Sequence, residues 1–186
     1  MHNRFISATM GAKEGVSMVV RRTISSPAGP LTLVSDGQAL QAVLFAQPRR
    51  IPACLREAAA EGERLPIFDE AAAWLAAYFQ GRRPDPAAIP LDPQGTPFQM
   101  AVWQLLREIP YGHTTTYGAL AREIAHRQGR AVMSAQAVGT AVGHNPIAIL
   151  IPCHRVLAAH TIGGFSGGED RKRFLLTLEN ILPKKW

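Results

Sequence analysis

The sequence predicts an α+β protein of two small domains, an N-terminal α/β domain and a C-terminal domain containing a helix-turn-helix. Three observations support this fold class. Short β-branched runs occupy residues 19–45, a proline-rich segment covers residues 82–95, and helices with strong start signals follow it. A length of 186 residues with 47% hydrophobic residues suits one compact domain or two small ones, and the proline segment favours two.

The N-terminal domain is expected to be a small antiparallel sheet covered by a helix. Turn sequences around Pro27-Ala28-Gly29-Pro30 and Asp36-Gly37 separate three predicted strands, at Val19–Ile24, Leu31–Val34 and Leu40–Phe45. The Ala-rich segment Asp69–Phe79 begins with acidic residues and stops before Gly81, which indicates a helix. We assign residues 17–81 to this domain and residues 1–16, which lack periodicity, to a disordered leader.

The second domain, residues 96–182, is expected to begin with a well-capped helix. Prolines at 84, 86, 90 and 93 make residues 82–95 a linker. Thr96 as N-cap, Pro97 in the first turn and Gln99 as the partner of a capping box then start a helix that ends at Pro110-Tyr111-Gly112. Its apolar residues share one face: Phe98, Val102, Leu105, Leu106 and Ile109.

Two shorter helices and a final one complete the domain. We expect helices at Thr116–His126 and Ser134–Val142, with inward residues Leu120, Ile124, Ala137, Val138 and Ala141. This pair reads as a helix-turn-helix whose second helix would lie against nucleic acid, although many helical hairpins bind no DNA. A last helix, Glu169–Asn180, precedes a basic tail at residues 183–186.

Composition narrows the partner and the compartment. Lys and Arg outnumber Asp and Glu by 20 to 14, which favours a polyanionic partner without establishing one. Two cysteines are too few for a disulfide framework or a cysteine-rich zinc site, so a reducing cytoplasmic location is the default. No apolar stretch approaches the roughly 20 residues that span a bilayer, so no membrane association is expected.

The segment from Asn145 to Val156 is the best candidate for chemistry. An apolar run closed by Pro152 predicts a buried extended segment that delivers Cys153 and His154 at its end. An imidazole, or a water held by one, can draw a proton from a thiol whose ordinary pKa is about 8.5. The alternatives are a buried, unreactive Cys153 and a structural His154, because adjacency in sequence does not bring side chains together.

Two downstream features are ambiguous by themselves. The glycine-rich loop Gly163–Gly168 either lets backbone donors approach a ligand closely or is a plain surface turn. Glu179 is either a solvated charge or a carboxylate that orients His154.

These residues together resemble a known family. Pro152-Cys153-His154-Arg155-Val156, with Asn145-Pro146 before it and Ser166-Gly167-Gly168 and Glu179 after it, is similar to the signature of the O6-alkylguanine-DNA alkyltransferases, or methylated-DNA-protein-cysteine methyltransferases. The resemblance runs from about Thr96 to Glu179 and implies a winged helix-turn-helix domain. The N-terminal domain resembles the family's ribonuclease H-like domain loosely, in the order of its elements.

The resemblance implies DNA repair by a protein that acts once. Double-stranded DNA would be bound through its minor groove, and the damaged nucleotide would be rotated out, because O6 is unreachable for in-line attack within the stack. The alkyl group of O6-alkylguanine would pass irreversibly to Cys153, without a cofactor and in a monomer. Activity on O4-alkylthymine and the preference for methyl or bulkier groups stay open.

The resemblance also assigns roles to single residues. Glu179 would orient His154, which would deprotonate Cys153 through a water; Asn145 would brace the turn; Tyr117 would help rotate the base and protonate the leaving guanine. The main chain at Cys153 and Val156 and the amide of Ser166 would bind the guanine, beside Phe165 and Lys172. The expected DNA contacts are Thr115, Tyr117, Ser134, Ala135, Gln136, Ala137 and Arg155.

Three positions depart from what many members of the family have. Gln136 stands where an arginine fills the gap left by the flipped base, His144 where a glycine is usual, and Phe165 where a tyrosine is usual. The zinc that some members bind is not expected, since Cys54 is the only thiol of the N-terminal domain.

Three other functions compete with this interpretation. An alkyltransferase-like protein binds alkylated DNA without transfer, but those relatives replace the cysteine that is present here as Cys153. A methylation-triggered regulator would need a metal-binding module, for which the chain lacks cysteines. A cysteine hydrolase or redox enzyme would turn over many times, whereas alkyl transfer predicts a stoichiometric burst and a mass gain on Cys153.

Overall fold

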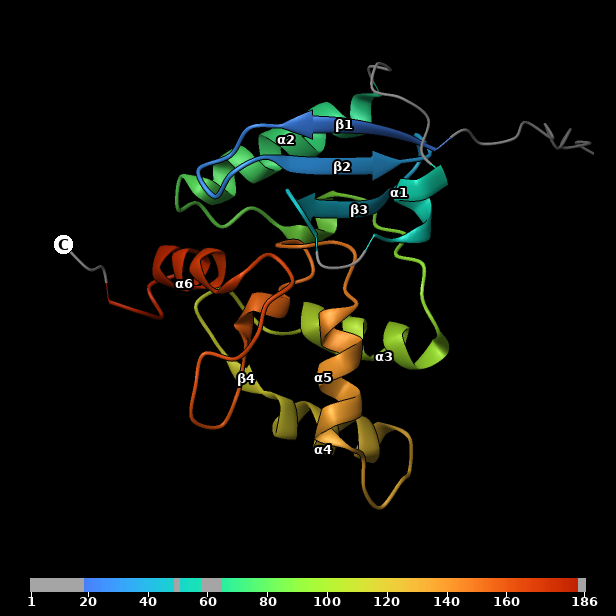
Figure 1. Cartoon of the computed structure of the whole chain (residues 1–186), viewed down its shortest axis with the longest axis vertical. Coiled ribbons are helices and arrows are strands. Elements are labelled where there is room, and N and C mark those ends of the chain that lie inside the picture. The colour runs from blue at the N-terminus through green and yellow to red at the C-terminus, as the bar shows by residue number, and fades with distance from the viewer. Residues whose placement is uncertain (1–18, 49–50, 58–64, 184–186) are drawn as a thin grey trace, which may run out of the picture.

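The computed structural model describes residues 19–48, 51–57 and 65–183. The two domains are stacked along the long axis of the molecule, with the sheet and α2 (Pro66–Phe79) at one end and the α3–α5 helices toward the other (Figure 1). The predicted leader, and the predicted tail apart from Pro183, lie outside the described residues.

The N-terminal domain is the predicted antiparallel meander. Strands β1 (Val20–Ile24), β2 (Leu31–Ser35) and β3 (Leu40–Phe45) lie in the order β1-β2-β3, and each matches its predicted bounds to within one residue. Helix α2 begins three residues before the predicted Asp69, because Pro66 occupies its first turn. The five-residue helix α1 (Ala53–Glu57) was not predicted.

The linker is partly integrated into the sheet. It contains one short 3₁₀ turn, η1 (Pro86–Ala88), capped by the side chain of Asp85. After that turn, Leu40 of β3 donates to the carbonyl of Pro90 (2.9 Å) and accepts from the amide of Asp92 (2.8 Å). The proline segment therefore connects the domains while lying against β3.

Helix α3 (Pro97–Arg107) confirms the predicted start signals. The Thr96 hydroxyl accepts from the amide of Gln99 (3.3 Å), whose side chain accepts from the amide of Thr96 (2.8 Å). The predicted apolar residues Val102, Leu105, Leu106 and Ile109 are buried, and Phe98 is partly buried. Trp103, which the pattern did not single out, is also buried and donates to the carbonyl of Ala141 (2.9 Å), tying α3 to α5.

Helices α4 (Tyr117–Arg127) and α5 (Ala135–Gly143) form the predicted helix-turn-helix. Their N-caps are Thr116 and Ser134, whose hydroxyls accept from the backbone amides three residues on. The expectation that Ala137 faces inward is wrong, because this residue is exposed and α5 packs through Val138, Ala141 and Val142. A parallel pair, β4 (Thr115–Thr116) and β5 (Val156–Leu157), lies beside the helices.

The segment before the cysteine is buried as predicted but is not extended. Ile147 makes a single bridge with Val43, after which the chain turns, with Ile149 at a φ of 72°. The turn then enters the 3₁₀ element η2 (Cys153–Arg155), and helix α6 (Glu169–Leu178) closes the fold. A run of apolar residues does not distinguish a strand from a buried turn, which explains the error.

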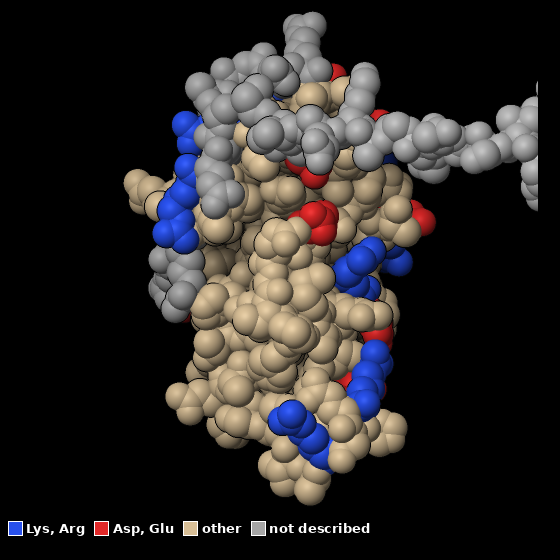
Figure 2. All heavy atoms as spheres, turned by 90° about the vertical axis from the view of Figure 1, so that its right-hand side faces the viewer, with Lys and Arg blue, Asp and Glu red and all other residues tan. Residues whose placement is uncertain are grey.

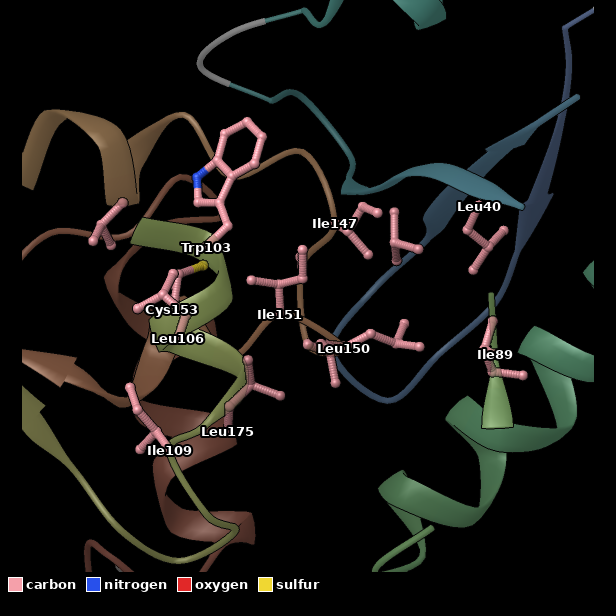
Figure 3. Packing of buried hydrophobic residues seen from close by; sticks show 14 of the residues in the cluster. Leu40, Ile89, Trp103, Leu106, Ile109, Ile147, Leu150, Ile151, Cys153 and Leu175 are labelled. Carbon is pink, nitrogen blue, oxygen red and sulfur yellow. The ribbon is translucent and has the colours of Figure 1, made fainter. Parts of the chain in front are cut away.

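The core is continuous between the two domains. In Figure 3, Ile147, Leu150 and Ile151 lie between Leu40 of β3 and Leu106 of α3, so the turn segment fills the space between sheet and helices. Cys153 lies at the edge of this packing. Within the described residues, no helix has the length and apolar character needed to cross a membrane.

Candidate active site

Cys153 opens η2 at the wall of a cavity. Its side chain is 4% exposed, yet it lines a cavity of about 330 Å³, within the size range of small-molecule sites. The cavity walls come from α4, α5 and the glycine-rich loop: Tyr117, Gly139, Thr140, Val142, Gly143, His144, Gly164, Phe165 and Ser166. The sulfur is thus sheltered from bulk water but open to a ligand in the cavity.

Asn145 holds the turn that presents the cysteine. Its side-chain oxygen accepts from the amide of Ile147 (3.0 Å), and its side-chain nitrogen donates to the carbonyl of Ile151 (2.8 Å) and to Cys153 Sγ (3.1 Å). Burial raises the pKa of the Cys153 thiol, while the Asn145 donor and the nearby Lys172 ammonium lower it. A donor aimed at the sulfur stabilises a thiolate, so Asn145 both braces the turn and assists ionisation.

His154 and Glu179 form a buried pair behind the cysteine. His154 Nε2 lies 2.8 Å from Glu179 Oε1, and both side chains are 0% exposed. Arg155 donates to both oxygens of Glu179 (2.8 and 2.9 Å), and the amide of Gly112 donates to Oε2 (3.1 Å). Burial opposes the charge of Glu179, but the bonds from His154 and Arg155 outweigh it and lower the pKa of Glu179 to about 2.

The ionised carboxylate fixes the protonation pattern of His154. Because Glu179 can only accept, the proton of a neutral imidazole lies on Nε2, and burial lowers the pKa of His154 so that the neutral form prevails at neutral pH. The other ring nitrogen, Nδ1, is buried and makes no hydrogen bond to any described residue. His154 therefore has an unprotonated nitrogen that can accept a proton.

Lys172 is a buried cation beside the same site. Its Nζ donates to the carbonyls of Val156 (2.6 Å) and Gly164 (3.2 Å). Burial lowers the pKa of Lys172 to about 8, although the charge of a Cys153 thiolate would raise it. The ammonium thereby ties the main chain at Val156 to that at Gly164, which lines the cavity.

The glycine-rich loop is held between the two domains. A Cβ on Gly167 would lie 2.6 Å from the Phe45 ring of β3, and Phe45 packs edge-on against Phe165 with centroids 5.8 Å apart. Arg171 of α6 donates to the carbonyls of Ala28 (2.9 Å) and Gly167 (2.8 Å). The loop is thus packed against the N-terminal domain, with Ser166 at the cavity wall.

The predicted DNA contacts are exposed or partly exposed, with one exception. Ser134, Ala135, Gln136 and Ala137 are exposed at the start of α5, and Thr115 and Tyr117 are partly exposed. On the face shown in Figure 2, Lys and Arg side chains lie toward the margins, including the end where α4 lies in Figure 1.

Arg155 is the exception. Its side chain is buried, it pairs with Glu179, and its Nη1 donates to the carbonyl of Ile109 (2.6 Å). The assignment of Arg155 as a DNA contact is therefore wrong, because all of these bonds are made inside the protein.

Nine of the predicted site residues come together in the structure. Four of them line the cavity, namely Tyr117, Cys153, Phe165 and Ser166, and the other five are linked to its wall by the chain or by hydrogen bonds: Asn145, His154, Val156, Lys172 and Glu179. One further residue was not predicted from the sequence. The added residue is Tyr78 of α2, whose hydroxyl donates to Glu179 Oε1 (2.7 Å). In the sequence, Tyr78 is one more aromatic residue on a helix face. Among the described residues, no cluster of three or more His, Cys, Asp or Glu could hold a metal ion.

Family models and known proteins match most of this chain. Residues 97–181 match the family model described as 6-O-methylguanine DNA methyltransferase, DNA binding domain, and residues 19–93 match its ribonuclease-like domain. A methylated-DNA–protein-cysteine methyltransferase of Haemophilus influenzae is 43% identical over 157 residues, covering 84% of this chain and 83% of the relative. One of Methanosarcina acetivorans is 40% identical, covering 83% of this chain and 94% of the relative.

Solved structures share the same two-domain fold. A crystal structure of Mycobacterium tuberculosis OGT in complex with DNA superposes with a TM-score of 0.71 at 41% identity, covering 86% of this chain and 91% of that one. A structure of an archaeal O6-methylguanine-DNA methyltransferase from Pyrococcus kodakaraensis, 24% identical, has a TM-score of 0.59 and supports the fold alone.

Proposed function

Because the chain belongs to the 6-O-methylguanine DNA methyltransferase family, we propose that Cys153 is the residue that takes the alkyl group. The chain is a methylated-DNA–protein-cysteine methyltransferase that repairs DNA by direct transfer. The observation that carries the assignment of Cys153 is its position at a cavity wall, with the Asn145 donor 3.1 Å from its sulfur. Cys54, the other cysteine, lies in α1 and makes no part of that wall.

The proposed reaction begins with the thiol proton. His154 Nδ1 accepts this proton, directly or through one water, and Glu179 stabilises the imidazolium that forms. The thiolate then attacks the alkyl carbon of O6-alkylguanine, the S–C bond forms, and the C–O6 bond breaks with its electron pair moving to O6. The thioether product is stable, so each molecule acts once.

The leaving guanine needs stabilisation and a proton. Ser166 lies in the loop at the cavity wall, where its amide can donate to O6 as charge develops there. Burial raises the pKa of the Tyr117 phenol, which keeps it protonated and able to give a proton to the departing base. The carbonyl of Val156, already bound by Lys172, has a second lone pair for the guanine amino group, and Phe165 flanks the base.

The DNA is proposed to lie along the exposed start of α5. Ser134 to Ala137, with Thr115 and Tyr117, would contact the minor groove, and Gln136 would fill the gap left by the flipped base. Phosphate contacts dominate proteins that scan DNA, so binding should be salt-sensitive with little sequence preference. We further propose a cytoplasmic monomer whose domains end at residues 81 and 182, with residues 82–95 between them.

Intact-protein mass spectrometry after mixing with an oligonucleotide carrying one O6-methylguanine tests the proposal. The wild type and Cys54→Ala should each gain one methyl group per molecule, located on Cys153, in a burst without turnover. Cys153→Ala should gain none yet bind the same DNA, because the phosphate contacts lie elsewhere. Undiminished transfer by Cys153→Ala, or repeated turnover by the wild type, contradicts the assignment.

A further inference from the structure

We propose that Tyr78, from the N-terminal domain, is a positioning residue for alkyl transfer: its hydroxyl holds the Glu179 oxygen that binds His154 and so sets how strongly His154 draws the thiol proton. This inference rests on the proposed function, because it needs His154 to act as the base. It assigns the ribonuclease-like domain a part in the chemistry.

Tyr78 reaches across the domain boundary to the buried pair. Its hydroxyl donates to Glu179 Oε1 (2.7 Å) and lies 3.5 Å from His154 Nε2. The two bonded residues are 101 positions apart in the sequence, on α2 and just after α6. Tyr78 and His154 therefore share one carboxylate oxygen.

The aromatic surroundings fix the Tyr78 ring. It stacks on Trp74 at an interplanar angle of 8°, and it packs edge-on against Phe79 (5.5 Å) and Tyr111 (6.1 Å). Only 1% of the residue is exposed. A phenol held in this way delivers its hydroxyl to one place, so its bond to Glu179 is preorganised.

The Tyr78 hydroxyl can act only as a donor to Glu179. Burial, followed by the charge of Glu179, raises the pKa of the Tyr78 phenol far above its ordinary value. A donor at Oε1 withdraws electron density from the oxygen that would otherwise stabilise a protonated His154. Tyr78 therefore weakens the pull of Glu179 and keeps His154 neutral before the thiol proton arrives.

Several other charged or titratable groups face this cluster. Arg155 pairs with Glu179, and Arg83 and Arg155 lie over the Tyr111 ring. The charge of Lys172 acts through space on both His154 and Cys153. Among the described residues, the hydrogen-bond partners of Glu179 Oε1 are Tyr78, His154 and Arg155. Removing the Tyr78 hydroxyl takes one hydrogen bond away from the Glu179 oxygen that bonds His154, without changing any formal charge.

Tyr111 provides a matched control. Its hydroxyl is also tethered near the domain boundary, but it donates to the carbonyl of Leu178 (3.1 Å) instead of the carboxylate. If Tyr78 serves only to hold the domains together, Tyr78→Phe and Tyr111→Phe should lower stability and leave the pH profile of transfer unchanged. If Tyr78 tunes His154, only Tyr78→Phe should move that profile.

The experiment measures single-turnover methyl transfer from an O6-methylguanine oligonucleotide at a series of pH values, for the full-length wild type and both variants. We expect the acid limb, where His154 becomes protonated, to move to higher pH by about one unit in Tyr78→Phe and to stay in place in Tyr111→Phe, since a hydrogen bond to a charged group is worth roughly tenfold or more. ¹⁵N NMR of His154 should show the same shift.

Replacement of Tyr78 by 3-fluorotyrosine covers the case in which Tyr78→Phe does not fold. Fluorine makes the phenol a stronger donor with nearly the same shape, so the acid limb should move to lower pH. Profiles that superimpose on the wild type throughout the folded pH range, for whichever of these variants folds, overturn the inference. Such a result leaves the proposed function intact if wild-type Cys153 still becomes methylated. If wild-type Cys153 does not become methylated, the proposed function itself is contradicted.

Discussion

At the scale of single residues, Lys172 shows how a buried charge can serve a neighbouring thiol. Its ammonium bonds two carbonyls at the cavity and lowers the pKa of Cys153 through space. Because burial lowers the pKa of Lys172 to about 8, it is still mostly protonated at neutral pH. The positive charge that favours the Cys153 thiolate is therefore present at neutral pH.

Lys172→Met should slow methyl transfer at neutral pH. The variant keeps the length of the side chain but removes the charge, so the pKa of Cys153 rises, and a shift of one unit lowers the thiolate population about tenfold. Single-turnover rates measure this effect. Arg173→Met, on the same helix but in an exposed ion pair with Glu169, is the control and should transfer at the wild-type rate. Equal rates for the two variants would contradict the role of Lys172.

The sequence predicts the candidate residues around Cys153 better than the residues that support them. Cys153, His154, Asn145 and Glu179 could be named as candidates because their types and spacing form a signature, and the structure brings them together. Tyr78 could not, because its partner is far away in the chain and a tyrosine on a helix usually belongs to the core. Arg155 was misassigned because arginine is normally exposed, and only the fold brings Glu179 to it.

At the scale of elements, helix starts could be predicted because they are local. Thr96, Thr116 and Ser134 each bond an amide three residues on, so the determinants lie within a few positions. The turn after Asn145 could not be predicted, since its shape depends on the Asn145 side chain and on contact with Val43. Ala137 was misplaced because a small residue is compatible with either face of α5.

Substitutions of the N-cap residues of α3 and α5 should distinguish an effect on stability from an effect on DNA binding. Thr96→Ala and Ser134→Ala each remove a side-chain cap, and each should lower the free energy of unfolding by about 1 kcal/mol. Only Ser134 lies on the exposed start of α5, so only Ser134→Ala should also weaken binding to duplex DNA. Urea unfolding and fluorescence anisotropy measure the two effects. Equal DNA affinities for the two variants would argue against α5 as the contact element.

Gln136→Arg tests the same element by a gain of function. The exposed Gln136 occupies the position at which we propose that a side chain enters the DNA stack, and a guanidinium there adds a favourable contact to a polyanion. We expect tighter binding and faster transfer at low salt, with an advantage that shrinks as salt increases. Ala131→Arg, in the exposed α4–α5 connection, controls for added charge alone. An identical gain from both variants would show that position 136 is not special.

At the scale of the whole molecule, the docking of the domains was the least predictable feature. The proline segment indicated two domains, but nothing local reveals that Leu40, Leu150 and Leu106 share one core. The hydrogen bonds made by Tyr78 and Arg171 could not be predicted either, because they join elements far apart in the chain. The active-site cluster and the domain interface are therefore one structure, and a disturbance of one should affect the other.

Acid should unfold both domains together through Glu179. Its pKa is lowered to about 2 in the folded protein against an ordinary 4.5, so its contribution to stability is fully present above pH 4.5 and is lost as the pH falls toward 2. This shift corresponds to about 3 kcal/mol. The lowered pKa of His154 acts in the same direction, because the unfolded chain takes up a proton on His154 at a higher pH than the folded one.

Urea unfolding at several pH values tests this coupling. Trp74 reports on the N-terminal domain and Trp103 on the C-terminal domain, so Trp103→Phe and Trp74→Phe, each combined with Trp186→Phe, leave a single buried reporter. Both reporters should show the same midpoint, and this midpoint should fall steeply below pH 4.5. Glu179→Gln should be less stable at neutral pH, since Arg155 loses its charged partner, but its stability should change less between pH 4.5 and 2. Separate midpoints for the two reporters would show that the domains unfold independently, and an equally steep acid loss in Glu179→Gln would place the titrating group elsewhere.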